Sequence, residues 1–261
     1  MKKRIISGAV IVAIFLLGFL LGPVAFKILV GAIALLAFRE IISLPNIKNH
    51  LSLPITILSF IAFFGLIYIV NDNYGLYIGM SYQMLALVLF VHIIPTLFSK
   101  KYDSETSLFL TSIFLLLGIS LNSSIMIYTS NKWILLYIIS VITATDVFAL
   151  LIGSYIGSHK LSAISPNKTV EGALGGLVCA TIIGTFYYLA VIGNQSVLRV
   201  IIMSILISVF GQIGDLFFSK IKRENKIKDY SNIIPGHGGI LDRIDSLLFG
   251  VLLYTLLCTI L

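Results

Sequence analysis

Long apolar runs constrain the fold of this chain more than any other feature of its sequence. A helix needs about 20 apolar residues to cross the hydrocarbon core of a bilayer, and by that measure the chain holds about nine candidate spans. We therefore predict an all-α fold, a polytopic integral membrane helical bundle of about nine transmembrane helices. The spans run approximately over residues 5–22, 24–44, 51–70, 76–98, 107–128, 133–152, 171–193, 197–218 and 241–261.

The composition excludes most soluble classes of protein. Only 11% of the residues are charged and the mean hydropathy is +1.06, whereas a soluble domain carries about 25% charged residues. The two cysteines, Cys179 and Cys258, lie inside apolar runs, so a disulfide framework or a zinc cluster is not expected. The sequence has no GxxxxGK[ST] loop and no HExxH motif, which argues against a P-loop ATPase and a zincin protease.

The positive charges indicate which side of the membrane each loop faces, because cytoplasmic loops retain Lys and Arg. If the N-terminus is inside, all of the 18 Lys and Arg residues except Lys27, Lys132 and Arg199 fall on the inner side. We therefore predict a multi-pass protein of the cell membrane with a cytoplasmic N-terminus. The basic residues 2–4 also fit a cleaved signal peptide, but the long apolar run after them favours a retained helix. No basic module interleaved with aromatic residues is present, so we expect no nucleic-acid partner.

Four aspartates lie in or at the edge of the predicted spans. Asp146 and Asp215 lie in the inner parts of the sixth and eighth spans, and Asp242 and Asp245 begin the ninth. A charge within a span costs at least a few kcal/mol unless it is paired, solvated or bound to metal, so such residues are functional candidates. In the eighth span Asp215 belongs to a polar face with spacings of three and four. The structural alternative is that Asp215 pairs with Lys or Arg and locks two helices together.

The loop before the ninth span has the composition of a phosphate site. Five basic residues precede the sequence PGHGG at 235–239. Glycines allow positive φ and close approach of the backbone, and the helix that follows adds partial positive charge at its N-terminus. Asp242 and Asp245 lie beside this anion site. Their carboxylates would repel a bound phosphate unless a cation lies between the carboxylates and the phosphate. A hard divalent ion such as Mg²⁺, held by carboxylates and substrate phosphates, would resolve that conflict.

This segment resembles, position for position, the signature of the phosphatidate cytidylyltransferases, also called CDP-diacylglycerol synthases. The block SPNKTVEG at 165–172 and the segment GQIGD at 211–215 are similar to two other stretches of that family. The resemblance covers roughly residues 140–261, and the first five spans are similar to the family only in hydropathy. The matching signature residues are Ser219, Lys222, Arg223, Lys228, Asp229, Ser231, residues 235–239, Asp242, Arg243 and Asp245.

The resemblance implies an enzyme that transfers a cytidylyl group from CTP to phosphatidic acid, forming CDP-diacylglycerol and pyrophosphate in phospholipid biosynthesis. We expect residues 1–130 to form N-terminal transmembrane helices and residues 131–261 to form the catalytic region, with cytoplasmic loops 153–170 and 219–240. The predicted catalytic residues are Asp215, Asp242, Lys222, Arg223, Lys228, Asp229, His237 and Arg243. The predicted substrate-binding residues are Ser165, Lys168, Thr169, Glu171, Ser219, Gly236, Gly238 and Gly239. The predicted ligands of Mg²⁺, or of another divalent cation, are Asp215 and Asp242, followed by Asp146 and Asp245.

This chemistry needs no Ser, Cys or His nucleophile, because the lipid phosphate is already nucleophilic near neutral pH. The enzyme has to bring two polyanions together and neutralise them. His237 is therefore expected to donate a hydrogen bond rather than to act as a general base. Asp146 is followed by Val147 and Phe148, which are bulkier than the family's usual residues, so we rank Asp146 below Asp215 and Asp242 as a ligand.

The block at 165–172 indicates a helix start that can bind an anion. Pro166 suits the turn into a helix, Asn167 or Thr169 can cap it, and Lys168 stands beside the free amides. The alternative is an ordinary cytoplasmic helix cap with a lysine that sets topology.

A stripe of small residues follows this block at intervals of four. Such a stripe lets transmembrane helices pack closely, so we interpret it as packing rather than chemistry. It is also compatible with a homodimer. The stripe consists of Gly172, Gly176, Ala180 and Gly184.

Three other functions stay open at this point. A CTP-dependent lipid kinase of the polyprenol type shares the nucleotide, the membrane and the cytosolic anion site, and it is the strongest rival. A secondary transporter also carries buried carboxylates, but the polar residues here gather on one face and no internal repeat is visible. A non-catalytic scaffold would have no reason to keep the complete charged motif.

Overall fold

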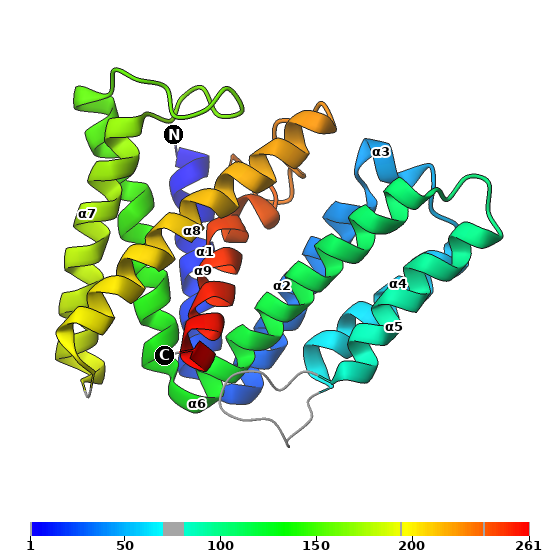
Figure 1. Cartoon of the computed structure of the whole chain (residues 1–261), viewed down its shortest axis with the longest axis horizontal. Helices are drawn as coiled ribbons and strands as arrows, with labels where there is room; N and C mark the ends of the chain where they lie inside the picture. The colour runs from blue at the N-terminus through cyan, green and yellow to red at the C-terminus, as the bar shows by residue number, and fades with distance from the viewer. Residues whose placement is uncertain (1, 70–80, 194, 237, 261) are drawn as a thin grey trace. The chain divides into compact units, whose positions relative to one another are not determined.

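The computed structural model describes residues 2–69, 81–193, 195–236 and 238–260. Within these residues every regular element is helical, and only two isolated β-bridges occur, between Lys160 and Thr169 and between Ile234 and Gly238. The prediction of an all-α fold is therefore confirmed. Figure 1 shows helices α1 (Lys2–Leu20), α2 (Pro23–Ile42), α3 (Pro45–Lys48), α4 (Leu53–Tyr68), α5 (Tyr82–Ile93), α6 (Ser104–Ile156), α7 (Val170–Tyr187), α8 (Val197–Glu224) and α9 (Leu241–Ile260). A 3₁₀ turn (Ile94–Leu97) extends α5, and a π-helical turn (Tyr188–Ile192) extends α7.

Several of these helices are apolar enough to lie in a membrane. Among the described residues, three helices have both the length and the hydropathy to cross one, and three shorter apolar helices accompany them. A helix satisfies its own backbone polar groups, which is what the hydrocarbon core requires. The chain is thus a helical membrane protein. The three long helices are Ser104–Ile156, Val170–Ile192 and Val197–Glu224, and the shorter ones are Ser7–Leu20, Leu53–Tyr68 and Tyr82–Leu97.

Helix α6 is two helices joined at a break. Its 53 residues would extend about 80 Å at 1.5 Å per residue, far more than the ~30 Å of a bilayer core. Asn131 leaves the helical conformation, with φ −154° and ψ 101°, and its side-chain oxygen accepts a hydrogen bond from the Trp133 amide at 3.0 Å. The break falls in the gap predicted between the spans at 107–128 and 133–152.

The chain folds into two compact units. The N-terminal unit comprises residues 1–126 and 225–243, and the C-terminal unit comprises residues 127–224 and 244–261. The glycine loop before α9 therefore belongs with the first helices, although about 100 residues separate it from residue 126 in the sequence.

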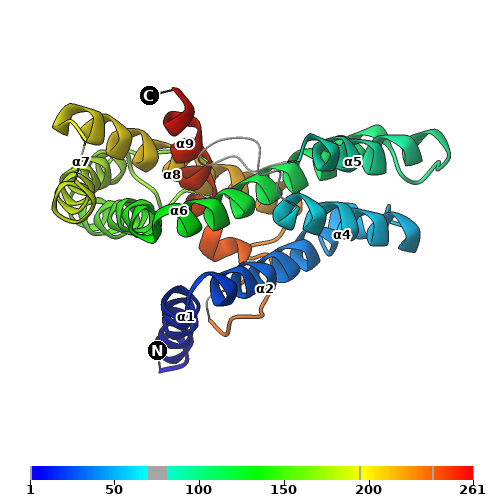
Figure 2. The same cartoon turned by 90° about the horizontal axis from the view of Figure 1, so that it is seen from below.

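An aromatic cluster forms the core of the N-terminal unit. Phe38 of α2 stacks on Phe63 of α4 and on Phe114 of α6, with ring centroids 5.9 and 5.1 Å apart. The Phe63 and Phe114 rings are 5.2 Å apart, and both side chains are fully buried. Helix α4 packs along α5, as Figure 2 shows. The cluster thus ties α2, α4 and the first half of α6 into one body.

The stripe of small residues packs within the C-terminal unit. Gly172, Gly176, Ala180 and Gly184 are all buried on α7. A Cβ on Gly176 would lie 2.6 Å from the carbonyl oxygen of Thr145 in α6, so only glycine allows the two backbones to approach this closely. The prediction that the stripe serves packing is confirmed, and its partner is α6 of the same chain.

Candidate active site

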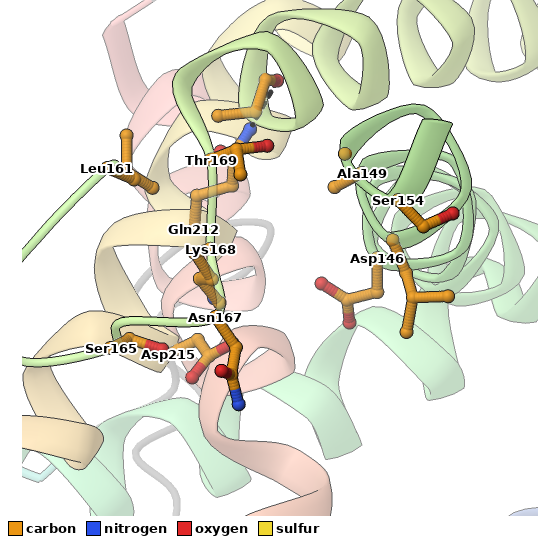
Figure 3. Close-up of a pocket in the computed structure, with 13 residues that line it drawn as sticks. Asp146, Ala149, Ser154, Leu161, Ser165, Asn167, Lys168, Thr169, Gln212 and Asp215 are labelled. Atoms are coloured by element: carbon orange, nitrogen blue, oxygen red, sulfur yellow. Dashed lines mark hydrogen bonds and ion pairs between the residues drawn. The ribbon is translucent and has the colours of Figure 1, made fainter. Parts of the chain in front are cut away.

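A cavity with charged and polar side chains on its wall opens in the C-terminal unit between α6, the loop 157–169 and α8. Its volume is about 560 Å³. In Figure 3 the Asp146 side chain points from α6 toward the loop that carries Asn167 and Lys168, and Asp215 lies beside Lys168. The cavity brings together five predicted site residues that are far apart in the sequence. These are Asp146, Ser165, Lys168, Thr169 and Asp215.

Lys168 and Asp215 form an ion pair in this cavity. The Lys168 ammonium donates to Oδ2 of Asp215, with both side chains partly exposed. The Ser219 hydroxyl, one turn further along α8, donates to the other Asp215 oxygen at 3.3 Å. The structural alternative for Asp215 was an ion pair with Lys or Arg that locks two segments together. The pair with Lys168 does fasten the loop 157–169 to α8. It also places a cation and a carboxylate on the wall of a cavity, where a phosphate can compete for the lysine.

Three aspartates repel one another in the C-terminal unit. Asp215 lies close enough to both Asp146 and Asp245 for its charge to repel theirs. Asp245 is 8% exposed, and its Oδ1 accepts a hydrogen bond from the Ser246 amide at 2.8 Å. Lys222, also buried on α8, attracts the Asp245 carboxylate. The unit thus concentrates negative charge with partial compensation by lysine.

These carboxylates have the right chemistry for a hard cation, because Mg²⁺ prefers oxygen ligands and is commonly held by one or two carboxylates plus substrate phosphates. Their mutual repulsion is what a cation would relieve. Within residues 2–69, 81–193, 195–236 and 238–260, however, no group of three or more His, Cys, Asp or Glu side chains is arranged to hold a metal ion. The metal-ligand roles of Asp146, Asp215, Asp242 and Asp245 therefore stay predictions.

The block at 165–172 builds one wall of the cavity and starts α7. Thr169 has extended backbone angles, and its hydroxyl accepts the Gly172 amide at 3.1 Å, so Thr169 is the N-cap. The Glu171 carboxylate accepts hydrogen bonds from the Ser158 amide at 3.1 Å and from the His159 ring at 2.6 Å. Glu171, predicted to bind substrate, thus holds the incoming loop in this structure.

The glycine loop in the N-terminal unit is a closed turn. Gly236 and Gly238 have φ of +78° and +82°, which side-chain-bearing residues rarely adopt. The Ile234 amide donates to the Gly238 carbonyl at 3.0 Å and closes the turn. Positive φ at these two glycines agrees with the predicted need for glycine. His237, predicted to be catalytic, lies outside the described residues.

The carboxylate of Asp242 is engaged within this loop. Its Oδ2 accepts hydrogen bonds from the Tyr230 amide at 3.0 Å and from the Gly239 amide at 2.9 Å. The Oδ2 atom of Asp242 therefore joins Tyr230, which precedes the glycine loop, to Gly239 at the end of that loop. Because the Gly239 amide already donates to the Asp242 carboxylate, it is not available to a phosphate in this structure, and its substrate-binding role stays a prediction.

Glu40 of α2 is a residue that our sequence reasoning missed. It is 2% exposed, and its carboxylate accepts hydrogen bonds from the Ser231 hydroxyl and from the amides of Ile240 and Leu241. The first amides of α9, which we predicted to attract substrate phosphate, are thus satisfied by a protein carboxylate. The signal that could have found Glu40 is the one used for the aspartates, since it is an acid within an apolar span.

The predicted site residues divide between the two units. Arg223, Lys228, Asp229 and Arg243 are exposed, whereas Ser219 and Lys222 are buried. The C-terminal unit holds Asp146, Ser165, Lys168, Thr169, Glu171, Asp215, Ser219, Lys222, Arg223 and Asp245. The N-terminal unit holds Lys228, Asp229, Gly236, Gly238, Gly239, Asp242 and Arg243.

Comparison with known proteins extends the resemblance to almost the whole chain. A family model described as "Cytidylyltransferase family" matches residues 2–261. The phosphatidate cytidylyltransferase of Bacillus subtilis (strain 168) is 34% identical over 261 residues, covering 95% of this chain and 94% of the relative. Those of Staphylococcus haemolyticus (strain JCSC1435) and Staphylococcus aureus (strain COL) are 32% and 33% identical, each covering 95% of both chains. The match includes the first helices, where the sequence analysis found similarity in hydropathy alone.

Proposed function

Because the chain belongs to the cytidylyltransferase family, we propose that it transfers the cytidylyl group of CTP to the phosphate of phosphatidic acid. CDP-diacylglycerol stays in the membrane and pyrophosphate leaves. Relatives of this name that cover 95% of the chain support the reaction. The structural observation that carries the proposal is the pairing of Lys168 with Asp215 on the wall of a cavity of about 560 Å³.

The proposed reaction joins two polyanions, and the cavity places Lys168 where it can compensate part of their charge. An oxygen of the lipid phosphate attacks the α-phosphorus of CTP. The bond between the α-phosphorus and the oxygen that bridges it to the β-phosphorus breaks, and pyrophosphate leaves with that oxygen and its negative charge. Lys168 neutralises phosphate charge in the cavity, and Thr169 holds the start of α7 beside it. The barrier is lowered mainly by bringing the two phosphates together and compensating their charge.

A divalent cation such as Mg²⁺, when bound, would supply positive charge to neutralise what develops on the leaving group. Asp215 and Asp242 are the residues we assign to hold it, with Asp146 and Asp245 in support. The basic residues that follow the family signature, Lys222, Arg223, Lys228 and Arg243, neutralise the remaining phosphate charge. His237, Gly236, Gly238 and Gly239 position the triphosphate. These roles rest on the family motif.

The proposed topology has about nine spans with the N-terminus and the active-site loops in the cytoplasm. It is supported by the concentration of Lys and Arg on one side of the predicted spans. Labelling of introduced cysteines from either side of the membrane tests this orientation. A homodimer stays a prediction, and the small-residue stripe of α7 does not support it, since that stripe is buried against α6.

The experiment that tests the reaction follows the label of CTP. Purified protein receives phosphatidic acid and CTP labelled at either the α or the γ phosphorus. We expect the α label to enter the lipid and the γ label to appear in pyrophosphate. A CTP-dependent lipid kinase would instead pass the γ label to a lipid hydroxyl and release CDP, so lipid labelled only from the γ position would reassign the protein to the kinases.

A further inference from the structure

Residues 225–241, which contain the glycine loop at 235–239, are fastened to three helices of the N-terminal unit. The Ser7 hydroxyl in α1 donates to the carbonyl oxygen of Pro235 at 2.9 Å. The Asn46 amide in α3 donates to the side-chain oxygen of Asn225 at 3.2 Å. The third fastening comes from Glu40 in α2. The first helices therefore hold the segment that carries much of the family signature.

Glu40 makes the most extensive of these contacts. Its Oε1 accepts hydrogen bonds from the Ser231 hydroxyl at 2.6 Å and from the Ile240 amide at 2.8 Å, and its Oε2 accepts the Leu241 amide at 2.9 Å. Burying a carboxylate is costly unless such donors compensate it. The first amides of a helix lack intrahelical partners and carry partial positive charge, so the start of α9 suits this carboxylate.

The fit between Glu40 and the loop is tight. A Cβ on Gly239 would lie 2.7 Å from the Glu40 Cδ, so any side chain at position 239 would displace the carboxylate. The amide of the same residue donates to Asp242 at 2.9 Å. Two carboxylates thus hold the end of the loop, one from α2 and one from α9.

We propose that Glu40 is a positioning residue for the cytidylyl transfer. From α2 its carboxylate holds residues 231–241 in a single conformation, and through them the glycine loop that we assign to the triphosphate. The inference rests on the proposed function, because the loop matters for catalysis only if it receives CTP. It gives the N-terminal helices a role in the reaction, which their hydropathy does not indicate. Glu40 acts through the loop and does not itself touch substrate.

Glu40→Gln tests the proposal with little change in volume. Gln keeps one acceptor oxygen but presents an NH₂ group to one of the donors that now bond to Glu40, so at least one hydrogen bond is lost. We expect the KM for CTP to rise at least tenfold while the KM for phosphatidic acid stays within twofold. Hydrogen exchange of the amides at 239–241 should become faster, with exchange in α4 unchanged.

Glu105→Gln is the matched control, because it makes the same chemical change at an exposed position in the same unit. It should leave both KM values and the exchange rates as in the wild type. The proposal is overturned if Glu40→Gln keeps the wild-type KM for CTP. It is also overturned if exchange at 239–241 is unchanged, or if exchange accelerates equally in α4, since Glu40 would then stabilise the whole unit rather than the loop.

Ser231→Ala is a milder variant that keeps the proposal testable if Glu40→Gln does not fold. It removes one donor to Glu40, so we expect a two- to fivefold rise in the KM for CTP. In the double variant the serine change should add nothing to the effect of Glu40→Gln, because Ser231 acts through Glu40. Full additivity of the two effects would refute the coupling. If the wild type itself labels no lipid from CTP, the proposed function fails, and the exchange rates alone decide whether Glu40 holds the loop.

Discussion

Asp215→Asn separates the catalytic from the structural interpretation of the ion pair with Lys168. The substitution keeps the volume of the side chain and removes its charge. Asn also keeps a carbonyl oxygen that can accept the hydrogen bond from Ser219. The substitution removes the negative charge that pairs with Lys168 and that we propose binds a metal ion.

The contacts of Asp215 allow the effect on stability to be estimated. The side chains of Lys168 and Asp215 are 30% and 25% exposed, so solvent screens the pair in part and its net contribution is about 1 kcal/mol. The charge of Asp215 also repels Asp146 and Asp245, and removing it relieves both interactions. The two effects have opposite signs, so we expect the free energy of unfolding to change by about 1 kcal/mol or less.

Catalysis should respond far more strongly than stability. Loss of a ligand charge at the reacting phosphates should lower kcat/KM at least ~100-fold, equivalent to about 3 kcal/mol of transition-state stabilisation. The assay is transfer of α label from CTP to lipid by purified protein, with thermal unfolding measured on the same samples. Asp72→Asn is the control, since position 72 lies in a predicted outer loop and should leave turnover unchanged. Turnover within threefold of the wild type for Asp215→Asn would refute the reasoning and favour a purely structural ion pair.

Three further predictions concern the metal, the topology and the packing. Chelation of divalent ions should abolish label transfer and added Mg²⁺ should restore it, whereas turnover that persists in excess EDTA would remove the metal from the reaction. Lys100→Cys and Lys220→Cys should react with an impermeant maleimide only in opened cells, whereas Asn73→Cys and Asn194→Cys should react in intact cells. Labelling of position 220 from outside would contradict the proposed orientation. Gly176→Leu should destabilise the protein by about 3 kcal/mol in thermal or denaturant unfolding, because its Cβ would meet the backbone of α6; an unchanged midpoint would show that the two helices can separate at no cost.

The helices and their breaks were predictable from the sequence because they depend on neighbouring residues. Apolar runs predicted the helices, and the structure has α7 at Val170–Tyr187 and α8 at Val197–Glu224, close to the predicted starts at 171 and 197. The capping role of Thr169 and the positive φ of Gly236 and Gly238 are local in the same sense. Each follows from the conformational preferences of one residue and its immediate neighbours.

Part of the site was also accessible from the sequence. An acid inside an apolar span has to be compensated, which singled out Asp146 and Asp215, and a lysine beside a helix start singled out Lys168. That Lys168 would pair with Asp215 was not predictable. The two residues are 47 positions apart, and their contact depends on how the loop 157–169 folds over α8.

Only the tertiary structure decided that residues 225–243 belong with the first helices and that Glu40 binds the start of α9. About 200 residues separate Glu40 from Leu241 in the chain. Hydropathy locates a helix in a membrane but not its rotation about its own axis, and each residue along a helix turns the facing direction by about 100°. Whether an acid on α2 faces lipid, water or another segment is therefore set by the packing of helices that are distant in sequence, and this packing turns Glu40 toward the free amides of α9.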